Sequence, residues 1–144
     1  MNKVRTAMPF FKAAFLSSLL FISCSALAQS ASQQALQKAL KPWQPVEVTK
    51  KDHELTVALP GKSMTPEAYD AVIKNGICMP IWTKSQATDA LKGVDKLNVT
   101  NQYKTLGYSF EKPLSTCEEM GKLTGQPSTT LMMSRTSLFS GVGK

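Results

Sequence analysis

The sequence has very few of the residues and motifs that mark an enzyme active site. It contains one histidine, His53, so a Ser-His-Asp or Cys-His site would have to use that residue. It has no nucleophile elbow, phosphate-binding loop, zinc-protease motif or glycine-rich dinucleotide turn. His53 lies in a polar stretch, where we expect a solvent-exposed loop. The motifs therefore propose no catalytic residue, although their absence does not exclude an enzyme.

Long apolar runs are also missing, apart from one near the N-terminus. Residues 13–22 are apolar, about half of the roughly 20 residues that a transmembrane helix needs. Basic residues precede the run, and a small-x-small cleavage site ends at Ala28. This pattern predicts a secretory signal peptide over residues 1–28. The predicted location is therefore the periplasm of a bacterium or the medium outside it.

Lipidation is the alternative form of processing. Phe21-Ile22-Ser23-Cys24 is a partial match to a bacterial lipobox, with Phe21 where leucine is usual. In that case Cys24 would carry the lipid and become the first residue of the mature protein. The cleavage site after Ala28 fits its pattern better.

Arginine is nearly absent from the predicted mature chain. The whole chain has 17 basic and 10 acidic residues, and removal of Lys3, Arg5 and Lys12 leaves 14 against 10, a net charge of +4. Arg135 is then the only arginine. Recognition of phosphates and bases favours the forked arginine side chain. The sequence therefore predicts a solvated lysine-rich surface and no nucleic-acid partner.

Cysteine is scarce, and this makes its pairing simple. Of three cysteines, only Cys78 and Cys117 remain after cleavage at Ala28. An even number in an exported chain predicts a disulfide, here closing a loop of about 40 residues worth ~4 kcal/mol on chain entropy. The alternative is two free thiols, buried or reactive. No CxxC pair occurs, so a thioredoxin-like redox role is not supported.

Metal-ligand spacing is not evident either. The methionines are dispersed and are expected to fill gaps in the core rather than bind Cu(I), and the acidic residues lack the spacing of a calcium loop. We therefore expect no metal and no cofactor. The methionines in question are Met64, Met79, Met120, Met132 and Met133.

Local patterns predict alternating strands and helices. Residues 46–59 alternate with period two and predict an antiparallel hairpin whose loop is residues 50–53. Thr65-Pro66-Glu67 predicts a helix start, and Asn75-Gly76 predicts its end. Residues 86–91 predict a short helix, and residues 97–110 a second hairpin. Ser115 and Glu118 match a capping box and predict a last helix to about residue 123.

These elements predict a small single α+β domain. It would have two antiparallel hairpins and two core helices tied by Cys78–Cys117, with helices on one face of an antiparallel sheet. The expected organisation is a signal peptide, a polar leader (residues 29–45) that is helical or loosely held, the stapled domain (residues 46–125), and a Ser/Thr-rich tail (residues 126–144). Residues 130–139 in the tail are a candidate edge strand.

The aromatic residues supply the candidate contact sites. Tyr69, Trp82 and Phe110 are expected in the core, whereas Trp43, between two prolines, and Tyr103, in a loop, are harder to bury. Exposed Trp and Tyr are favoured anchors of protein interfaces. We therefore expect a binding protein whose partner is another envelope or secreted protein, such as an inhibitor, an immunity protein or an envelope-assembly factor. A carrier of a small ligand or metal is the alternative, and an enzyme that uses His53 ranks last.

Overall fold

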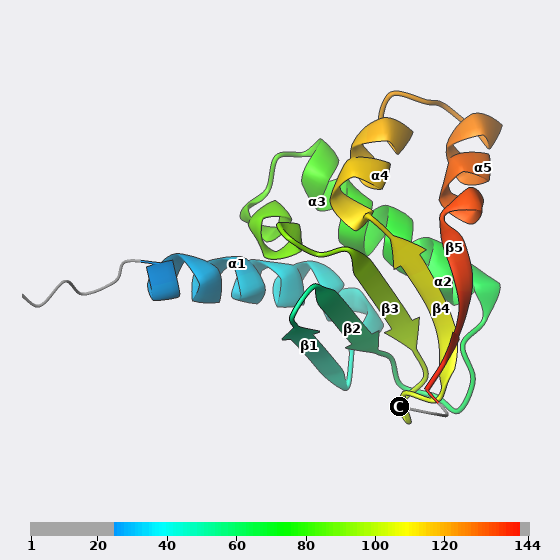
Figure 1. The fold of residues 1–144 in the computed structure, drawn as a ribbon, viewed down its shortest axis with the longest axis horizontal. Coiled ribbons are helices and arrows are strands. Elements are labelled where there is room, and N and C mark those ends of the chain that lie inside the picture. Colours follow the sequence, from blue (N-terminus) through cyan, green and yellow to red (C-terminus); the bar gives the residue numbers. More distant parts are fainter. Residues whose placement is uncertain (1–24, 142–144) are drawn as a thin grey trace, which may run out of the picture.

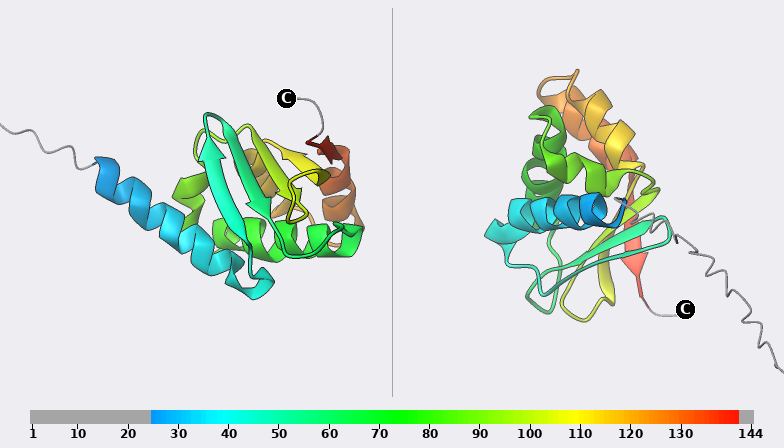
Figure 2. Two further views of the ribbon diagram at one scale, coloured as in Figure 1. Left: turned by 90° about the horizontal axis from the view of Figure 1, so that it is seen from below. Right: turned by 90° about the vertical axis from the view of Figure 1, so that its left-hand side faces the viewer.

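The computed structural model describes residues 25–141. The apolar run of the predicted signal peptide and Cys24 lie outside these residues. The chain forms one small α+β domain in which a five-stranded sheet is covered by helices on one face (Figures 1 and 2). No helix in the described part combines the length and hydrophobicity needed to cross a bilayer.

Along the described chain, two β-hairpins and a final strand are separated by groups of helical segments. The helices are α1 (Ser25–Leu40), η1 (Lys41–Trp43), α2 (Pro66–Ala71), η2 (Val72–Cys78), α3 (Met79–Trp82), η3 (Gln86–Leu91), α4 (Pro113–Met120) and α5 (Gln126–Ser134). The strands are β1 (Glu47–Lys51), β2 (Glu54–Ala58), β3 (Lys96–Thr100), β4 (Leu106–Glu111) and β5 (Thr136–Ser140).

The sheet is mixed rather than antiparallel as expected. Its order is β1-β2-β3-β4-β5, and β2 pairs with β3 in parallel while the other three pairs are antiparallel. The cause is the connection between the two hairpins: the chain leaves the end of β2, passes through α2, η2, α3 and η3, and enters β3 at the opposite end of the sheet, beside the start of β2. A crossover of this kind produces parallel neighbours.

The first hairpin has a tighter turn than the sequence suggested. Lys50 and Lys51 belong to β1, so the turn consists of Asp52 and His53, and Asp52 adopts a φ of 52°. Lys50 remains in the strand because its ammonium group donates to the carbonyl oxygens of Ala90 at 3.1 Å and Lys92 at 2.8 Å. The hairpin is thereby attached to the end of η3.

The core lies between the helices and alternate residues of the central strands. Val57 pairs with Val99, and Val99 with Tyr108, while Leu55, Leu97 and Phe110 form the next row. The opposite face of the sheet carries a polar row in register: Thr49, Thr56, Asn98, Ser109 and Ser137. This alternation is what period-two patterning predicts for a sheet covered on one side.

Tyr69 connects the core to the last strand. Its ring centroid lies 4.8 Å from that of Tyr108, its hydroxyl shares a hydrogen bond of 2.7 Å with Thr136 Oγ1, and Thr136 Oγ1 is also hydrogen-bonded to Met132 O at 2.8 Å. Burial raises the pKa of Tyr69 to about 12, and the hydrogen bond to Thr136 opposes this shift. As expected, Tyr69 and Phe110 are core residues.

Gly76 does not end a helix, contrary to the prediction. α2, η2 and α3 are continuous from Pro66 to Trp82, and η2 is a π-helical segment in which Met79 N–H bonds Lys74 O. The wider turn accommodates Pro80, whose ring would clash with a carbonyl in a regular α-helix. Gly76 instead permits close packing, because an added Cβ would lie 2.8 Å from Leu40 Cδ2 and 3.1 Å from Trp43 Cζ3.

The C-terminal third also differs from prediction. α4 starts at Pro113, and Ser115 lies inside it, so there is no capping box; Lys112 occupies the N-cap position at φ 48° without a side-chain cap. Residues 126–134 form α5, so the first half of the candidate edge strand, residues 130–139, is helical, and the strand that does form, β5, covers residues 136–140. In Figure 1, α5 and β5 follow one another at the far side of the sheet from β1.

The predicted disulfide is present. Cys78 and Cys117 are bonded, with their Cα atoms 5.0 Å apart, and the bond ties the end of η2 to α4. Both cysteines are 0% exposed. The bridge is therefore part of the core and not a surface clamp.

Candidate functional site

Trp82 was expected in the core, but it lies at the surface with 37% of its area exposed. It is the last residue of α3, and a polar segment starting with Thr83 follows it. Its indole Nε1 donates to the carbonyl oxygen of Cys117 at 2.7 Å. The ring therefore crosses the outer side of the disulfide-linked helices with one edge anchored.

Gly121 lets the ring lie flat against α4. An added Cβ at this glycine would be 2.7 Å from Trp82 Nε1 and 2.8 Å from Cδ1, which is closer than real contacts allow. Gly121 has ordinary helical angles, φ −66° and ψ −17°, so its small size rather than its backbone freedom explains the residue. The ring is thus held by its hydrogen bond to Cys117 O and by close packing on Gly121.

Two open hollows meet at Trp82, which lines both together with Gly121. The Ser85 hollow, about 780 Å³, is lined by Ile81, Trp82, Lys84, Ser85, Gln86, Thr88, Asp89, Glu118, Gly121 and Lys122. The Thr129 hollow, about 910 Å³, is lined by Lys74, Asn75, Trp82, Met120, Gly121, Leu123, Gly125, Gln126, Ser128 and Thr129. We call this region, Trp82 with both hollows, the Trp82 surface.

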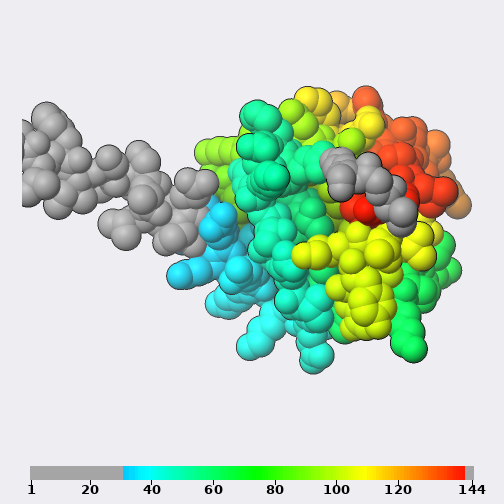
Figure 3. All heavy atoms as spheres, turned by 60° about the horizontal axis from the view of Figure 1, so that its bottom comes forward, coloured from blue at the N-terminus to red at the C-terminus, as the bar shows by residue number. Residues whose placement is uncertain are grey.

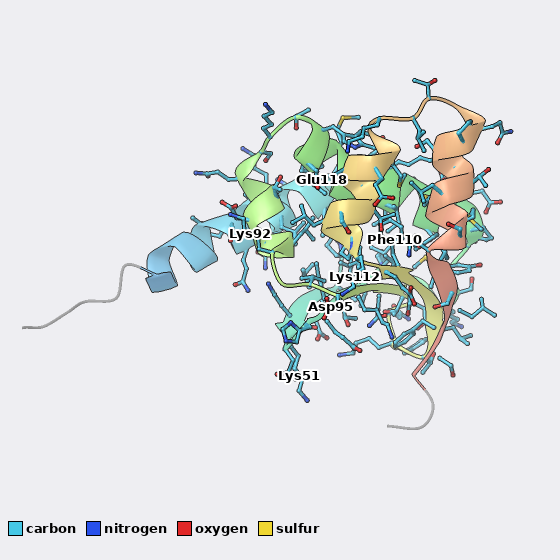
Figure 4. The ribbon with its side chains drawn as sticks, turned by 45° about the horizontal axis from the view of Figure 1, so that its top comes forward. Lys51, Lys92, Asp95, Phe110, Lys112 and Glu118 are labelled. Atoms are coloured by element: carbon cyan, nitrogen blue, oxygen red, sulfur yellow. A yellow bond between two sulfur atoms is a disulfide. The ribbon has the colours of Figure 1, made fainter. Side chains whose placement is uncertain are left out.

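The charges on the Trp82 surface are mixed. In the Thr129 hollow, Lys74 forms an ion pair with Asp70 at 2.8 Å and donates to Thr129 Oγ1 at 3.2 Å. The Ser85 hollow is lined by two lysines, Lys84 and Lys122, and by two carboxylates, Asp89 and Glu118; Figure 4 labels Glu118 on α4. Because tryptophan is enriched among the residues that dominate interface energy, the partly exposed, anchored Trp82 makes this region the candidate contact surface.

The residues first considered for partner contact are separate from this surface. Trp43 is half-buried in η1 and packs over Gly76 against the core. Tyr103 lies in the turn between β3 and β4 and is 57% exposed; this turn is the yellow projection in Figure 3. Neither residue lines the Trp82 surface, so partner contact through Trp43 or Tyr103 stays an untested prediction and is the alternative to contact through that surface.

His53 lies in the exposed β1–β2 turn, as expected. Its Nδ1 is 2.8 Å from Gly93 O, and its own carbonyl accepts from the amides of Asp95 and Lys96. Asp95 also pairs with Lys112 at 2.6 Å, and this hydrogen bond lowers the pKa of the Asp95 carboxyl (Figure 4). In this geometry, His53 attaches the hairpin turn to the start of β3.

Residues 25–141 contain no group of three or more His, Cys, Asp or Glu side chains placed to hold a metal ion. Sequence reasoning missed the Trp82 surface because it assigned the indole to the core. The available signal was the polar segment, residues 83–89, that follows Trp82 directly.

Comparison of the chain with protein-family models, with characterised proteins and with solved structures found no match. The class that the fold defines is a small, disulfide-linked α+β protein with a mixed five-stranded sheet.

Proposed function

We propose that this protein is exported to the bacterial periplasm or secreted, and that it binds another envelope or secreted protein through the Trp82 surface. It would act as an inhibitor, an immunity protein or an envelope-assembly factor. The observation that carries the proposal is the Trp82 ring, held in place between two open hollows. A buried disulfide is compatible with an oxidising compartment.

The fixed position of Trp82 favours a role in recognition. Tryptophan is enriched among the few residues that dominate binding energy, and an anchor that is already ordered loses little entropy on binding. Here the Nε1–Cys117 hydrogen bond and the contact with Gly121 order the ring before any partner arrives. One ring with a hollow on each side suits a partner that inserts two side chains.

The test is capture of a partner from an envelope extract with the oxidised, exported protein as bait, followed by affinity measurement. Replacing Trp82 with Ala should weaken binding by 2 kcal/mol or more, about thirtyfold in Kd, as is usual for a central anchor. Trp82→Phe keeps an apolar ring and should retain part of the affinity. Thermal melts of each variant show whether the fold is intact.

Two matched controls locate the contact. Tyr103→Ala removes an exposed aromatic, and Trp43→Ala removes the other tryptophan; both should leave the affinity close to that of the unaltered protein. If either control abolishes binding while Trp82→Ala does not, the partner surface is at that residue and the Trp82 proposal is wrong.

Carriage of a small ligand is the second candidate, because each hollow falls within the roughly 300–1,000 Å³ range of small-molecule sites. A bound metabolite or metal in the native mass spectrum of the purified protein, lost in Trp82→Ala, would favour it. A ligand-free mass together with a stoichiometric captured protein would support the protein-binding function.

A further inference from the structure

The outer edge of β5 is an unprotected strand edge. β5 pairs only with β4 among the described strands, and it forms the end of the sheet (Figure 1). Natural edge strands are usually protected by charges, prolines or bulges. Residues 136–140, Thr-Ser-Leu-Phe-Ser, contain no charge and no proline, and their pairing with β4 is continuous.

The opposite edge of the sheet is protected. β1 contains three charged residues, Glu47, Lys50 and Lys51, and Pro45 precedes it. Glu47 is also paired with Lys104 at 2.7 Å. Pairing another strand with β1 would require desolvation of these groups, so the two edges of one sheet differ in their capacity to accept a strand.

The hydrogen bonds at the two ends of β5 determine which groups point outward. Arg135 O accepts from Glu111 N at 2.9 Å, and Gly141 N donates to Thr105 O at 3.0 Å. In an antiparallel ladder alternate residues bond to one neighbour, so the odd-numbered residues of β5 face β4. The amides and carbonyls of Thr136, Leu138 and Ser140 therefore face away from the sheet.

Leu138, at the centre of this outward set, is 83% exposed. It is cross-strand partner to Tyr108, on the face of the sheet that elsewhere supplies the core. A leucine this exposed in the middle of an edge strand leaves apolar area that a further strand would cover.

We propose that β5 pairs antiparallel with β5 of a second copy of this chain, about a two-fold axis at Leu138. In this register Leu138 faces Leu138 of the second copy, and Thr136 faces Ser140. The three outward-facing residues of each strand then exchange all their backbone hydrogen bonds. The interface is isologous, as two-fold symmetry requires.

The lack of charged side chains in β5 favours pairing between two copies of the strand. The five residues of β5 bring no charge into register, and the flanking Arg135 falls opposite Gly141 of the second copy. In this register Leu138 meets an equally exposed Leu138, Ser137 lies opposite Phe139, and no like charges face each other, so a second copy covers the exposed leucine with an apolar side chain of its own. Two five-residue strands bury less than the roughly 1,200 Å² of a stable specific interface, so the dimer is weak and depends on concentration.

Sedimentation velocity of the processed, oxidised protein tests the proposed dimer. The protein concentration is varied from about 10 μM to 1 mM, the range in which weak association is detected. The average mass should rise toward that of a dimer. Leu138→Lys places two ammonium groups against each other on the axis and should raise the dimer Kd at least about tenfold. The matched control is Val46→Lys, which changes an exposed apolar residue, 56% exposed, just before β1 at the opposite edge of the sheet; it should dimerise normally.

Amide hydrogen exchange gives a second measurement. The amides of Leu138 and Ser140 should become more protected as concentration rises, with no change in Leu138→Lys. A protein that stays monomeric at about 1 mM, a dimer that Leu138→Lys does not weaken, or a dimer whose β5 amides remain unprotected would each overturn the proposal. None of these results depends on the Trp82 surface.

Discussion

Substitution of Gly121 by Ala should displace the Trp82 ring while changing the unfolding free energy of the fold only slightly. The new Cβ would lie 2.7 Å from Trp82 Nε1, so the ring must move by several tenths of an ångström. The movement lengthens and weakens the 2.7 Å hydrogen bond to Cys117 O, at a cost of up to about 1 kcal/mol. Because Gly121 has helical angles, alanine there also restricts the unfolded chain and recovers about 0.4–1 kcal/mol. We therefore expect a small net change in unfolding free energy and a displaced indole.

The assay is a double-mutant cycle by urea denaturation. In the unaltered protein Gly121→Ala should change stability by less than about 1 kcal/mol, whereas in the Trp82→Ala background it should stabilise by about 0.4–1 kcal/mol. Fluorescence in a Trp43→Phe background reports Trp82 alone, and its emission should shift to the red as the ring leaves its contact. Equal effects of Gly121→Ala in both backgrounds, together with an unchanged emission spectrum, would refute the reasoning.

Two further predictions concern stability. Replacing both Cys78 and Cys117 with Ala should lower the unfolding free energy by ~4 kcal/mol, because the reduced chain regains loop entropy; a loss below about 1 kcal/mol in urea denaturation would contradict this. Tyr69 has a pKa of about 12 in the folded state and about 10 in the unfolded state, so it ionises more readily when the chain is unfolded. Its contribution to the unfolding free energy is therefore complete below pH 10 and is lost as pH rises toward 12. Between pH 9 and 11 the protein should therefore lose about 1.4 kcal/mol more stability than Tyr69→Phe does. Identical pH profiles would show that Tyr69 ionises normally in the folded state.

Features encoded locally could be predicted from the sequence. The four strands of the hairpins follow period-two alternation, and η3 occupies the residues predicted for a short helix. The Cys78–Cys117 bridge followed from there being only two cysteines after the predicted cleavage. The helix start at Pro66 has its expected cap, since Thr65 Oγ1 accepts from Ala68 N at 3.2 Å.

Features that depend on distant packing could not be predicted in this way. Gly76 resembles a helix terminator until Leu40 and Trp43, more than 30 positions earlier in the chain, are seen to pack on it. Trp82 is apolar and next to a predicted core, and only the carbonyl of Cys117 and the small Gly121 explain its place at the surface. The parallel β2–β3 pairing likewise depends on the path of the crossover.

Complete burial of the disulfide has a consequence for the order of events in folding. Both cysteines are 0% exposed, so neither an oxidant nor a reductant can reach the sulfur atoms in the finished molecule. Thiol–disulfide exchange needs direct attack on sulfur. The bond must therefore form at a stage of folding when η2 and α4 can still move apart, before the core closes. Once the core has closed, reduction of the bond requires η2 and α4 to move apart again, so the rate of this opening limits how fast the bridge can be reduced.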